Sequence, residues 1–549
     1  MALRGEGVDN IFTLAGDHVL PLLDVMSDMG FRFIDTRHEQ GAVHMADAWG
    51  RITGGPGVAM YTTPGFANAI PGLSNALHAE SPLLSISGSA PLPELGRGAM
   101  QEIDQVGMAL PTTKASWMVT DVRRIPQMVS QALRVAYAGR RGPVHLTIPI
   151  DLQEQTVSED EISFHGPVHN GAIPAPGDRG LIEEAVALLR RSNRPLIIAG
   201  TAAAYSDSEE ALRRLVETSR IPVMTEGDAR GLVPDDHPNS AGFFDNGLNR
   251  AARLSGTADA VLLLGKKQDI ILGYAMPSTI GKDAALVQVD PSAEEIGRNR
   301  AATIGIVGDV ATVVDQLATE ASRHTWTEPA WAAELRAERD AQSEWLETLA
   351  VDEAPMHAMK VHKVLESFIR PDDCLVFDGG DYCHFGRAFH PARLPRRWFY
   401  VSPLGMLGTA LPTALAAKLA HPDRRVFLFT GDGAFGFNAM EYDTAVRHGL
   451  NIVGILGNDS AWGIDRQIQL GVYGKPVATD LLPTRYDQVV AGLGGYGELV
   501  ERPDELPAAV DRALASGLSA LLNVTVQRGI SPRAKAAVAR WTSRGIQPF

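Results

Sequence analysis

The chain of 549 residues has little cysteine and no long hydrophobic run. Its two cysteines, Cys374 and Cys383, do not suggest a disulfide framework, so a reduced, cytoplasmic protein is expected. No stretch of about 18 apolar residues occurs, which argues against a membrane-spanning helix. The opening segment MALRGEGVDNIFTLAGDHVL contains an acid and polar breaks, so no secretory signal is expected.

An excess of positive charge is also missing, because the formal net charge is −15 at pH 7. This balance argues against general nucleic-acid binding. The exception is the C-terminal segment 528–549, which has no acid and carries five basic residues: Arg528, Arg533, Lys535, Arg540 and Arg544. A local basic segment on an acidic protein indicates a small anionic ligand. A solvated terminal helix whose arginines face water is the equal alternative.

Helices alternate with short apolar strands along most of the chain, which predicts an α/β protein with doubly wound parallel sheets. We place three such domains at 1–165, 181–325 and 355–527, with the basic segment 528–549 after them. A stretch rich in proline and glycine at 165–180 reads as a linker, and a charged helical segment bridges the second and third domains.

The most informative segment is GDGAFGFNAMEYDTAVRHGLNIVGILGNDSAWG at 431–463. The buried strand Arg425–Thr430 leads into Gly431-Asp432-Gly433, and a second apolar strand, Ile452–Leu456, leads to Asn458. An acid and an amide therefore lie at the strand ends where parallel sheets bind ligands. Glycines let backbone amides approach a phosphate, and Asp432 and Asn458 offer hard oxygen ligands to Mg²⁺. Taken alone, the glycines are equally a turn beside an unrelated amide.

This segment resembles the diphosphate motif of thiamine diphosphate (ThDP) enzymes. The whole chain follows the order of the acetolactate synthase-like family: a pyrimidine-binding, a central and a diphosphate-binding domain. The resemblance implies that Asp432, Asn458 and Ser460 hold Mg²⁺. It implies further cofactor contacts from Gly431, Gly433, Ala434, Phe435, Asp381 and Tyr382. The family's active site lies between two chains, so at least a homodimer, and commonly a homotetramer, is expected.

The segment RHEQGAVHMADAWGR (37–51) resembles the HEQ element of the same family, in which Glu39 takes the place of the catalytic glutamate. ThDP acts through a carbanion at its thiazolium ring. A carboxylate bonded to the pyrimidine ring favours the tautomer that removes the thiazolium proton. In the alternative reading, Glu39 is only an acid favoured by a helix dipole.

The segment SPLGMLGTALPTA (402–414) resembles the family element that bends the cofactor. By that match Leu407 is the apolar wedge between the two cofactor rings, and the Gly405 carbonyl meets the amino group. The neighbouring Met406 is the alternative wedge, because the family often has methionine there.

Further matches suggest a substrate pocket. Phe66 in TTPGFAN (62–68) would form its wall, and Gln101 in MQEIDQ (100–105) is the preferred polar contact with the substrate. Glu80 lies where some relatives place a catalytic histidine and would act as a base for a substrate hydroxyl. The remaining pocket candidates are His78, Trp462, Asp465 and Glu498.

The central domain lacks Gly-x-Gly-x-x-Gly, so no standard dinucleotide fingerprint is present. Acetolactate synthases usually carry an Arg-Phe-Asp-Asp segment associated with FAD, whereas this chain has GKKQDIILG at 265–273. FAD is therefore not expected. In the CoA-dependent branch of the family the same cleft holds ADP, and the candidates for binding it here are Asp290, Arg230 and Asp309.

The basic tail would suit a lid over coenzyme A (CoA), because arginines bind phosphates through charge-assisted bonds. The residues expected to contact CoA are Arg533, Lys535, Arg540, Trp541 and Arg544. These features favour a 2-hydroxyacyl-CoA lyase that releases formyl-CoA and an aldehyde or ketone, with 2-hydroxyisobutyryl-CoA giving acetone as the expected example. The alternatives are an acetolactate synthase or another 2-oxo acid decarboxylase or carboligase, and a non-catalytic regulator with the same fold.

Overall fold

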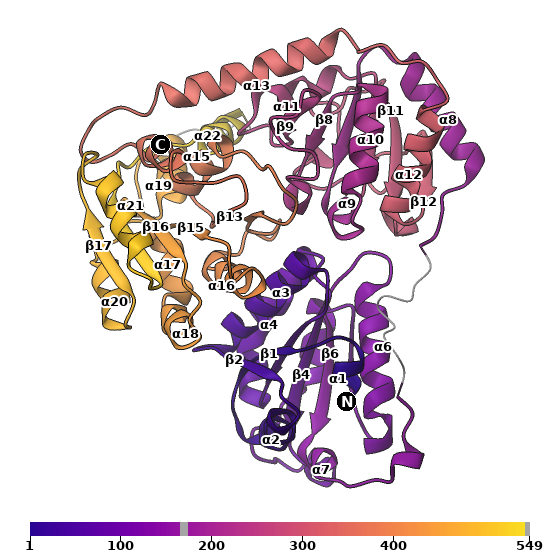
Figure 1. The fold of residues 1–549 in the computed structure, drawn as a ribbon, viewed down its shortest axis with the longest axis vertical. Helices are drawn as coiled ribbons and strands as arrows, with labels where there is room; N and C mark the ends of the chain where they lie inside the picture. Colours follow the sequence, from indigo (N-terminus) through magenta and orange to yellow (C-terminus); the bar gives the residue numbers. More distant parts are fainter. Residues whose placement is uncertain (165–173, 544–549) are drawn as a thin grey trace.

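The computed structural model describes residues 1–164 and 174–543. It contains three six-stranded sheets, one after another along the chain, and every strand pair is parallel (Figure 1). Helices cover the sheets on both faces, so the strands read as continuous apolar runs rather than alternating ones. The fold is therefore α/β with three doubly wound parallel sheets, as the sequence predicted.

The first sheet has the strand order β2-β1-β3-β4-β6-β5. Its strands are β1 Asn10–Leu14, β2 Arg32–Asp35, β3 Gly57–Tyr61, β4 Leu83–Ser89, β5 Ala115–Met118 and β6 Val144–Pro149. Its helices are α1 Ala2–Gly5, α2 Leu20–Asp28, α3 Glu39–Thr53, α4 Thr63–His78, α5 Gln105–Ala109, α6 Ile125–Tyr137 and α7 Ile150–Gln153.

The second sheet has the order β12-β11-β10-β7-β8-β9. Its strands are β7 Pro195–Ala199, β8 Val223–Thr225, β9 Ser240–Phe243, β10 Ala260–Leu264, β11 Ala285–Asp290 and β12 Ile304–Val307. Its helices are α8 Arg179–Arg191, α9 Thr201–Tyr205, α10 Glu209–Ser219, α11 Arg250–Arg253 and α12 Val310–Ala321. The long helix α13, Trp331–Glu347, then runs to the third sheet, where the charged bridging helix was predicted (Figure 1). The predicted linker lies largely outside the described residues, at 165–173.

The third sheet has the order β14-β13-β15-β16-β18-β17. Its strands are β13 Cys374–Phe377, β14 Trp398–Tyr400, β15 Val426–Gly431, β16 Val453–Asn458, β17 Tyr496–Val500 and β18 Ala520–Thr525. Its helices are α14 Ala358–Glu366, α15 Asp381–Phe389, α16 Ala410–Ala420, α17 Asp432–Asn438, α18 Glu441–Arg447, α19 Gly463–Tyr473, α20 Tyr486–Gly492, α21 Leu506–Ala515 and α22 Pro532–Ser543.

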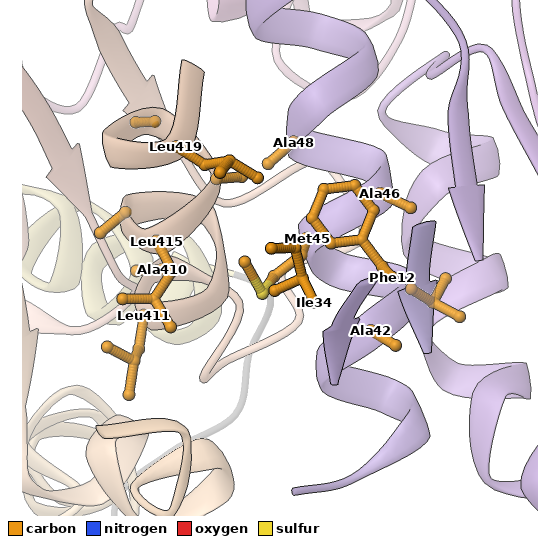
Figure 2. Packing of buried hydrophobic residues seen from close by; sticks show 14 of the residues in the cluster. Phe12, Ile34, Ala42, Met45, Ala46, Ala48, Ala410, Leu411, Leu415 and Leu419 are labelled. Atoms are coloured by element: carbon orange, nitrogen blue, oxygen red, sulfur yellow. The ribbon is translucent and has the colours of Figure 1, made fainter. Parts of the chain in front are cut away.

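The first and third domains share one hydrophobic core, formed where helix α3 packs on helix α16. Figure 2 shows Met45 and Ala48 of α3 facing Leu411, Leu415 and Leu419 of α16. Small residues on both helices allow this close approach. The contact fixes the start of α3, which carries Glu39, relative to the third sheet.

No helix in the described parts of the chain is long and apolar enough to cross a membrane.

Candidate functional site

The carboxyl edge of the third sheet gathers most of the residues that the sequence predicted for the cofactor. Gly431 ends β15 and lies opposite Gly457 of β16 in the parallel register, so Asp432 and Asn458 emerge side by side. A cavity of about 80 Å³ opens at this edge. Its lining includes nine of the predicted residues: Gly431, Asp432, Gly433, Ala434, Asp381, Tyr382, Leu407, Trp462 and Asp465.

Glycines at the cavity leave room for a ligand or for a neighbouring aromatic ring. A Cβ atom added at Gly431 or Gly380 would meet no atom within 4 Å, so a phosphate can approach these two backbones closely. A Cβ at Gly433 would lie 2.7 Å from the Trp462 ring, so this position has room only for hydrogen. Tyr382 presses on Gly457 in the same way, and its buried hydroxyl has no hydrogen-bond partner among the described residues.

Two carboxyl groups share the middle of the cavity. Asp432 accepts a hydrogen bond from the Ala461 amide at 3.1 Å, and burial together with the neighbouring Asp459 raises the pKa of Asp432 to about 7. Burial also raises the pKa of Asp459 to about 6. Adjacent buried carboxylates need a cation to stay ionised, so the donor set fits a divalent metal. Sequence reasoning missed Asp459 as a site residue; its position directly after Asn458 was the available signal.

Asn458 is held in place by its amide group. Its nitrogen donates to Asn523 at 3.1 Å and to the Thr484 carbonyl at 3.2 Å, while its oxygen accepts from the Ser460 amide at 3.2 Å. The carbonyl of Ser460 already accepts hydrogen bonds from the Leu481 amide and from Arg528, both at 2.8 Å. The Ser460 carbonyl is therefore already occupied by two hydrogen bonds, and Asp432 and the Asn458 oxygen are the better candidates to hold a metal.

Arg528 holds the loop that follows Asn458. Its guanidinium donates to the carbonyls of Asp459 at 2.9 Å and Ser460 at 2.8 Å, and it pairs with Asp480 at 2.9 Å. Ser460 has a left-handed backbone with φ of 54°. This conformation is unfavourable for a residue with a side chain, and the three bonds from Arg528 offset that cost.

Arg528→Gln is therefore expected to weaken binding of ThDP in the presence of Mg²⁺ by about tenfold, because one charge-assisted clamp on the loop is lost. Calorimetric titration of ThDP at fixed Mg²⁺ measures this. The exposed Arg502, which pairs only with neighbouring acids, supplies the control Arg502→Gln. Equal ThDP affinity in both variants would show that the clamp does not support the site.

The C-terminal tail lies against this cavity. Gln527 and Gly529 line it, and the Ser531 amide donates to Asp381 at 3.2 Å. Helix α22 then packs on α19, where Val538 lies 2.8 Å from the Cβ position of Gly471. Burial raises the pKa of Asp381 to about 6, and the Ser531 bond opposes that shift.

The residues of the tail that were predicted to contact CoA differ in their surroundings. Arg533 pairs with Asp245 of the central domain at 2.6 Å. Lys535 and Arg540 are exposed on α22, and Trp541 is half-buried. Arg544 lies outside the described residues. The tail therefore lies against the cofactor cavity, and Arg533 links it to the central domain.

Glu39 is buried at the first turn of α3. Its carboxylate accepts a hydrogen bond from Asn68 at 3.0 Å, and a Cβ on Gly65 would lie 2.6 Å from it. Only glycine fits at position 65 of the TTPGFAN segment, because the Glu39 carboxylate occupies the space that a side chain would need. Glu39 does not line the cavity that contains Asp432 in the same chain. Completion of the site by a second chain stays a prediction.

Leu407 lines the cofactor cavity, and its side chain presses against Gly379, whereas Met406 is not part of the lining. This favours Leu407 over Met406 as the wedge. Gly405 has a left-handed backbone with φ of 73° and lines a second cavity of about 140 Å³.

Two predicted residues belong to hydrophobic cores instead. Phe66 is fully buried, with its ring 4.5 Å from the His145 ring, so it cannot form a pocket wall. Phe435 is buried 5.3 Å from the Tyr486 ring, on the opposite side of α17 from the cavity's glycines. Both positions were inferred from neighbouring motif residues, and helix geometry turns them inward.

Three further residues lie away from the cofactor cavity. Glu498 is on the edge strand β17, where it pairs with Arg512 at 2.5 Å at the surface. Gln101 lies in a loop with φ of 58°, and its side-chain oxygen is buried without a partner among the described residues. His78 ends α4 and faces two cavities at the central domain.

Glu80 is part of an ion-pair network between the first and central domains. It pairs with Arg140 at 2.7 Å and with Lys267 at 2.6 Å, and Arg140 also bonds Asp290. Burial opposes ionisation of Glu80, but the two cations outweigh it and lower its pKa. A carboxylate held in this way is a poor proton acceptor, which corrects the expectation that Glu80 is a base.

The three residues predicted to contact ADP also make other contacts in the structure. Asp290 is fully buried beneath Arg140 and does not reach a ribose. Arg230 pairs with Asp235 and lies 3.9 Å over the Trp398 ring, joining the central and third domains. Asp309 caps helix α12 by accepting from the Thr312 amide at 2.9 Å. These side chains form structural contacts, which corrects their assignment to ADP.

A cavity of about 680 Å³ nevertheless lies at the carboxyl edge of the central sheet. Among the described residues, Lys114 and Arg141 line it without an ion pair to a carboxylate. Lys114 donates to the carbonyl of Arg140 at 2.7 Å, and burial lowers its pKa to about 8. Arg141 stacks on Tyr137 and Tyr205 and keeps one buried nitrogen without a partner. Lys114 and Arg141 were not predicted for this cavity, because both lie in the first domain whereas the cavity lies at the central sheet.

Three family profiles match the chain: "Thiamine pyrophosphate enzyme, N-terminal TPP binding domain" at residues 1–108, the "central domain" at 182–317, and the "C-terminal TPP binding domain" at 378–524. The chain belongs to the ThDP-dependent enzymes of the acetolactate synthase-like family. Thiamine pyrophosphate is another name for ThDP. Most residues that line the cofactor cavity lie within the third matched range, and Glu39 lies within the first.

The relatives of the chain divide between two activities. It is 36% identical over 533 residues to "Acetolactate synthase large subunit IlvG" of Mycobacterium tuberculosis, covering 96% of this chain and 95% of the relative. It is 34% identical over 559 residues to "2-hydroxyacyl-CoA lyase" of Oryza sativa subsp. japonica, covering 96% and 94%. It is 33% identical over 542 residues to human "2-hydroxyacyl-CoA lyase 2", covering 92% and 84%. The relatives therefore agree with the ThDP-dependent family, whose reaction in this chain is a decarboxylation, a carbon–carbon bond cleavage or a carboligation.

Proposed function

We propose that this protein is a 2-hydroxyacyl-CoA lyase that uses ThDP and Mg²⁺. It cleaves the bond between C1 and C2 of a 2-hydroxyacyl-CoA and releases formyl-CoA with an aldehyde or ketone. The observation that carries this proposal is a pair of adjacent cavities, called the path below, that extends from the central domain to the segment 402–414. The two cavities of about 680 and 140 Å³ share His78, Thr201, Glu226 and Pro403, and the smaller one reaches Gly405.

A CoA thioester is long and carries several phosphates, and this path suits both properties. Lys114 and Arg141 at its wide end have no carboxylate partner in residues 1–164 and 174–543, so they are available to a phosphate. The same cations would suit ADP bound in the central domain. Helix α22 crosses the third domain beside the path and carries the exposed Lys535 and Arg540.

When bound, the cofactor would supply a nucleophilic carbon that adds to the thioester carbonyl and a thiazolium ring that accepts the electron pair left by cleavage of the C1–C2 bond. Within the chain, Asp432 and Asn458 would hold Mg²⁺ at the diphosphate, and Leu407 would separate the two rings. Glu39, supplied by a partner chain, would hold a proton at the pyrimidine ring. Trp462 and Asp465 both line the cofactor cavity and would face the substrate. With Phe66 in the core, Trp462 alone supports a small branched substrate such as 2-hydroxyisobutyryl-CoA.

Mass spectrometry after incubation with ThDP, Mg²⁺ and a series of 2-hydroxyacyl-CoA thioesters tests the proposal. Formyl-CoA together with a carbonyl product is the expected result, and the identity of the carbonyl compound defines the substrate. A yellow protein containing flavin that forms acetolactate from pyruvate, with no formyl-CoA, would replace the proposal with acetolactate synthase, the function printed for the relative at 36% identity.

Removal of the tail beyond Pro532 is expected to raise KM for the CoA substrate at least tenfold, because Arg533 and helix α22 are lost from beside the path. ThDP binding is expected to change little, since Arg528 and the Ser531 contact with Asp381 remain. Steady-state kinetics and ThDP titration on the same preparation separate the two effects. An unchanged KM would show that α22 is not a lid for CoA.

A further inference from the structure

The loop that carries the predicted wedge Leu407 is held at Gly408 by two buried side chains. The carboxylate of Asp378, which directly follows strand β13, accepts the Gly408 amide at 3.1 Å on one oxygen and at 3.2 Å on the other. Asn438, at the end of α17, donates to the Gly408 carbonyl at 2.8 Å. Asp378 is 1% exposed and Asn438 is 5% exposed, so both bonds are shielded from water.

Asp378 also compensates for a cap that helix α16 lacks. Thr409, at the N-cap position of α16, makes no side-chain hydrogen bond to the first turn. The first amides of a helix have no partner within it, and a carboxylate close to them is stabilising. In the described parts of the chain no cation pairs with Asp378. Burial raises its pKa to about 6, and the amides of Gly379, Gly408 and Ala410 oppose that shift, so the group is ionised at pH 7.

The surroundings of Gly408 leave the loop little freedom. Gly408 has φ of 79°, a conformation that favours glycine, and a Cβ atom there would lie 2.4 Å from the Cβ atom of Phe437. The Leu407 side chain presses against Gly379, which lines the cofactor cavity and directly follows Asp378. The Asp378 segment therefore contacts Leu407 itself and also binds the residue after it, so a displaced Gly408 would carry Leu407 with it.

We propose that Asp378 is a positioning residue for the cofactor: together with Asn438 it holds Gly408 and thereby fixes Leu407, the residue that would separate the two rings of ThDP. Asp378 does not line the cofactor cavity, so it acts through the loop and not by touching the cofactor. The wedge keeps the cofactor bent, and the bent form brings its amino group to the thiazolium proton. The inference holds for any ThDP reaction, so it does not depend on the choice between lyase and acetolactate synthase.

Proton exchange at the thiazolium carbon of bound ThDP, followed by NMR in the holoenzyme without substrate, tests the proposal. Asp378→Asn is expected to slow this exchange by about 10- to 100-fold, the range in which a displacement of about 1 Å lowers a rate. Asn438→Ala removes the other bond to Gly408 and is expected to slow the exchange as well. ThDP affinity should change far less in both variants, because Asp432 and Asn458 remain in place.

Asp373→Asn is the matched control. Asp373 precedes the same strand β13, is 5% exposed, and accepts from Arg425 at 3.0 Å and from the Arg370 amide at 2.7 Å, at the strand end away from the cavity. Its replacement is expected to lower Tm but to leave proton exchange at the thiazolium carbon normal. In the apoprotein, amide hydrogen exchange in the segment 405–410 should accelerate in Asp378→Asn only. Equal slowing of the thiazolium exchange in both variants would indicate a general loss of stability and overturn the proposal.

A double-mutant cycle with Leu407→Ala shows whether Asp378 acts through the wedge, because residues of one contact network have non-additive effects. In the Leu407→Ala background, Asp378→Asn is expected to slow the thiazolium exchange no further. If the two losses multiply, or if Leu407→Ala alone exchanges at the normal rate, the proposal is wrong. Should Asp378→Asn not fold, the same cycle with Asn438→Ala decides the matter. Formyl-CoA formation is measured separately, so failure of the lyase assignment leaves this test unaffected.

Discussion

Glu39→Gln is expected to lower kcat by about 10²- to 10⁴-fold, the range in which loss of a positioned proton-transfer group usually falls. Glutamine preserves the shape of the side chain and can still face Asn68, so the buried first turn of α3 should remain intact. ThDP affinity should therefore change far less than kcat. The loss of rate comes from the missing negative charge at the pyrimidine ring.

Single-turnover kinetics together with proton exchange at the thiazolium carbon of bound ThDP measure this effect directly. Glu154→Gln is the control, since Glu154 is an exposed glutamate of the same domain. If Glu39→Gln retained full activity and a normal exchange rate, Glu39 would be only an acid favoured by the helix dipole, and a non-catalytic member of the fold would gain support.

Asp432→Asn is expected to weaken Mg²⁺-dependent binding of ThDP on the order of 100-fold. Removing a metal ligand should weaken metal binding at least as much as removing a group that hydrogen-bonds to such a ligand. The cavity retains Asp459, which accepts a proton readily without a cation nearby. Titration of ThDP at several Mg²⁺ concentrations measures the change. Asp511→Asn, at an exposed position on α21, is the control.

The pH dependence of the wild-type protein gives a second measurement of the same group. The pKa of Asp432 is raised to about 7 in the folded protein without metal, so the carboxyl group is protonated below that pH. Mg²⁺ binds the ionised form, and its affinity should therefore fall as pH drops from about 8 to 6. Asp432→Asn should remove most of this dependence. A wild-type affinity that is constant over this range would contradict the role of Asp432.

Much of the fold could be predicted from the sequence because buried parallel strands are short apolar runs that end at polar or glycine residues. The strand Val426–Gly431 and the strand Val453–Asn458 were identified in this way within two residues. Between these strands the chain forms two helices, α17 and α18, with a break at Ala439 and Met440. Asp432, which the sequence places directly after a strand, lines the cofactor cavity as predicted.

Sequence reasoning failed where the partner of a side chain is distant along the chain. Glu80 reads as an available acid, but its properties are set by Arg140 and by Lys267 of another domain. Asp290 ends a strand as a ribose ligand would, yet Arg140 covers it. Desolvation and tertiary ion pairs decide these roles, and neither is encoded locally.

The bonds from Arg528 to the carbonyls of Asp459 and Ser460 have a consequence for the order of events during biosynthesis. The glycines, Asp432 and Asn458 emerge from the ribosome well before Arg528, which follows the last strand of the third sheet. A nascent chain therefore possesses the cofactor's ligands before it possesses the clamp that fixes their loop. The clamp on this loop is therefore expected to form late in synthesis, after the last strand of the third sheet.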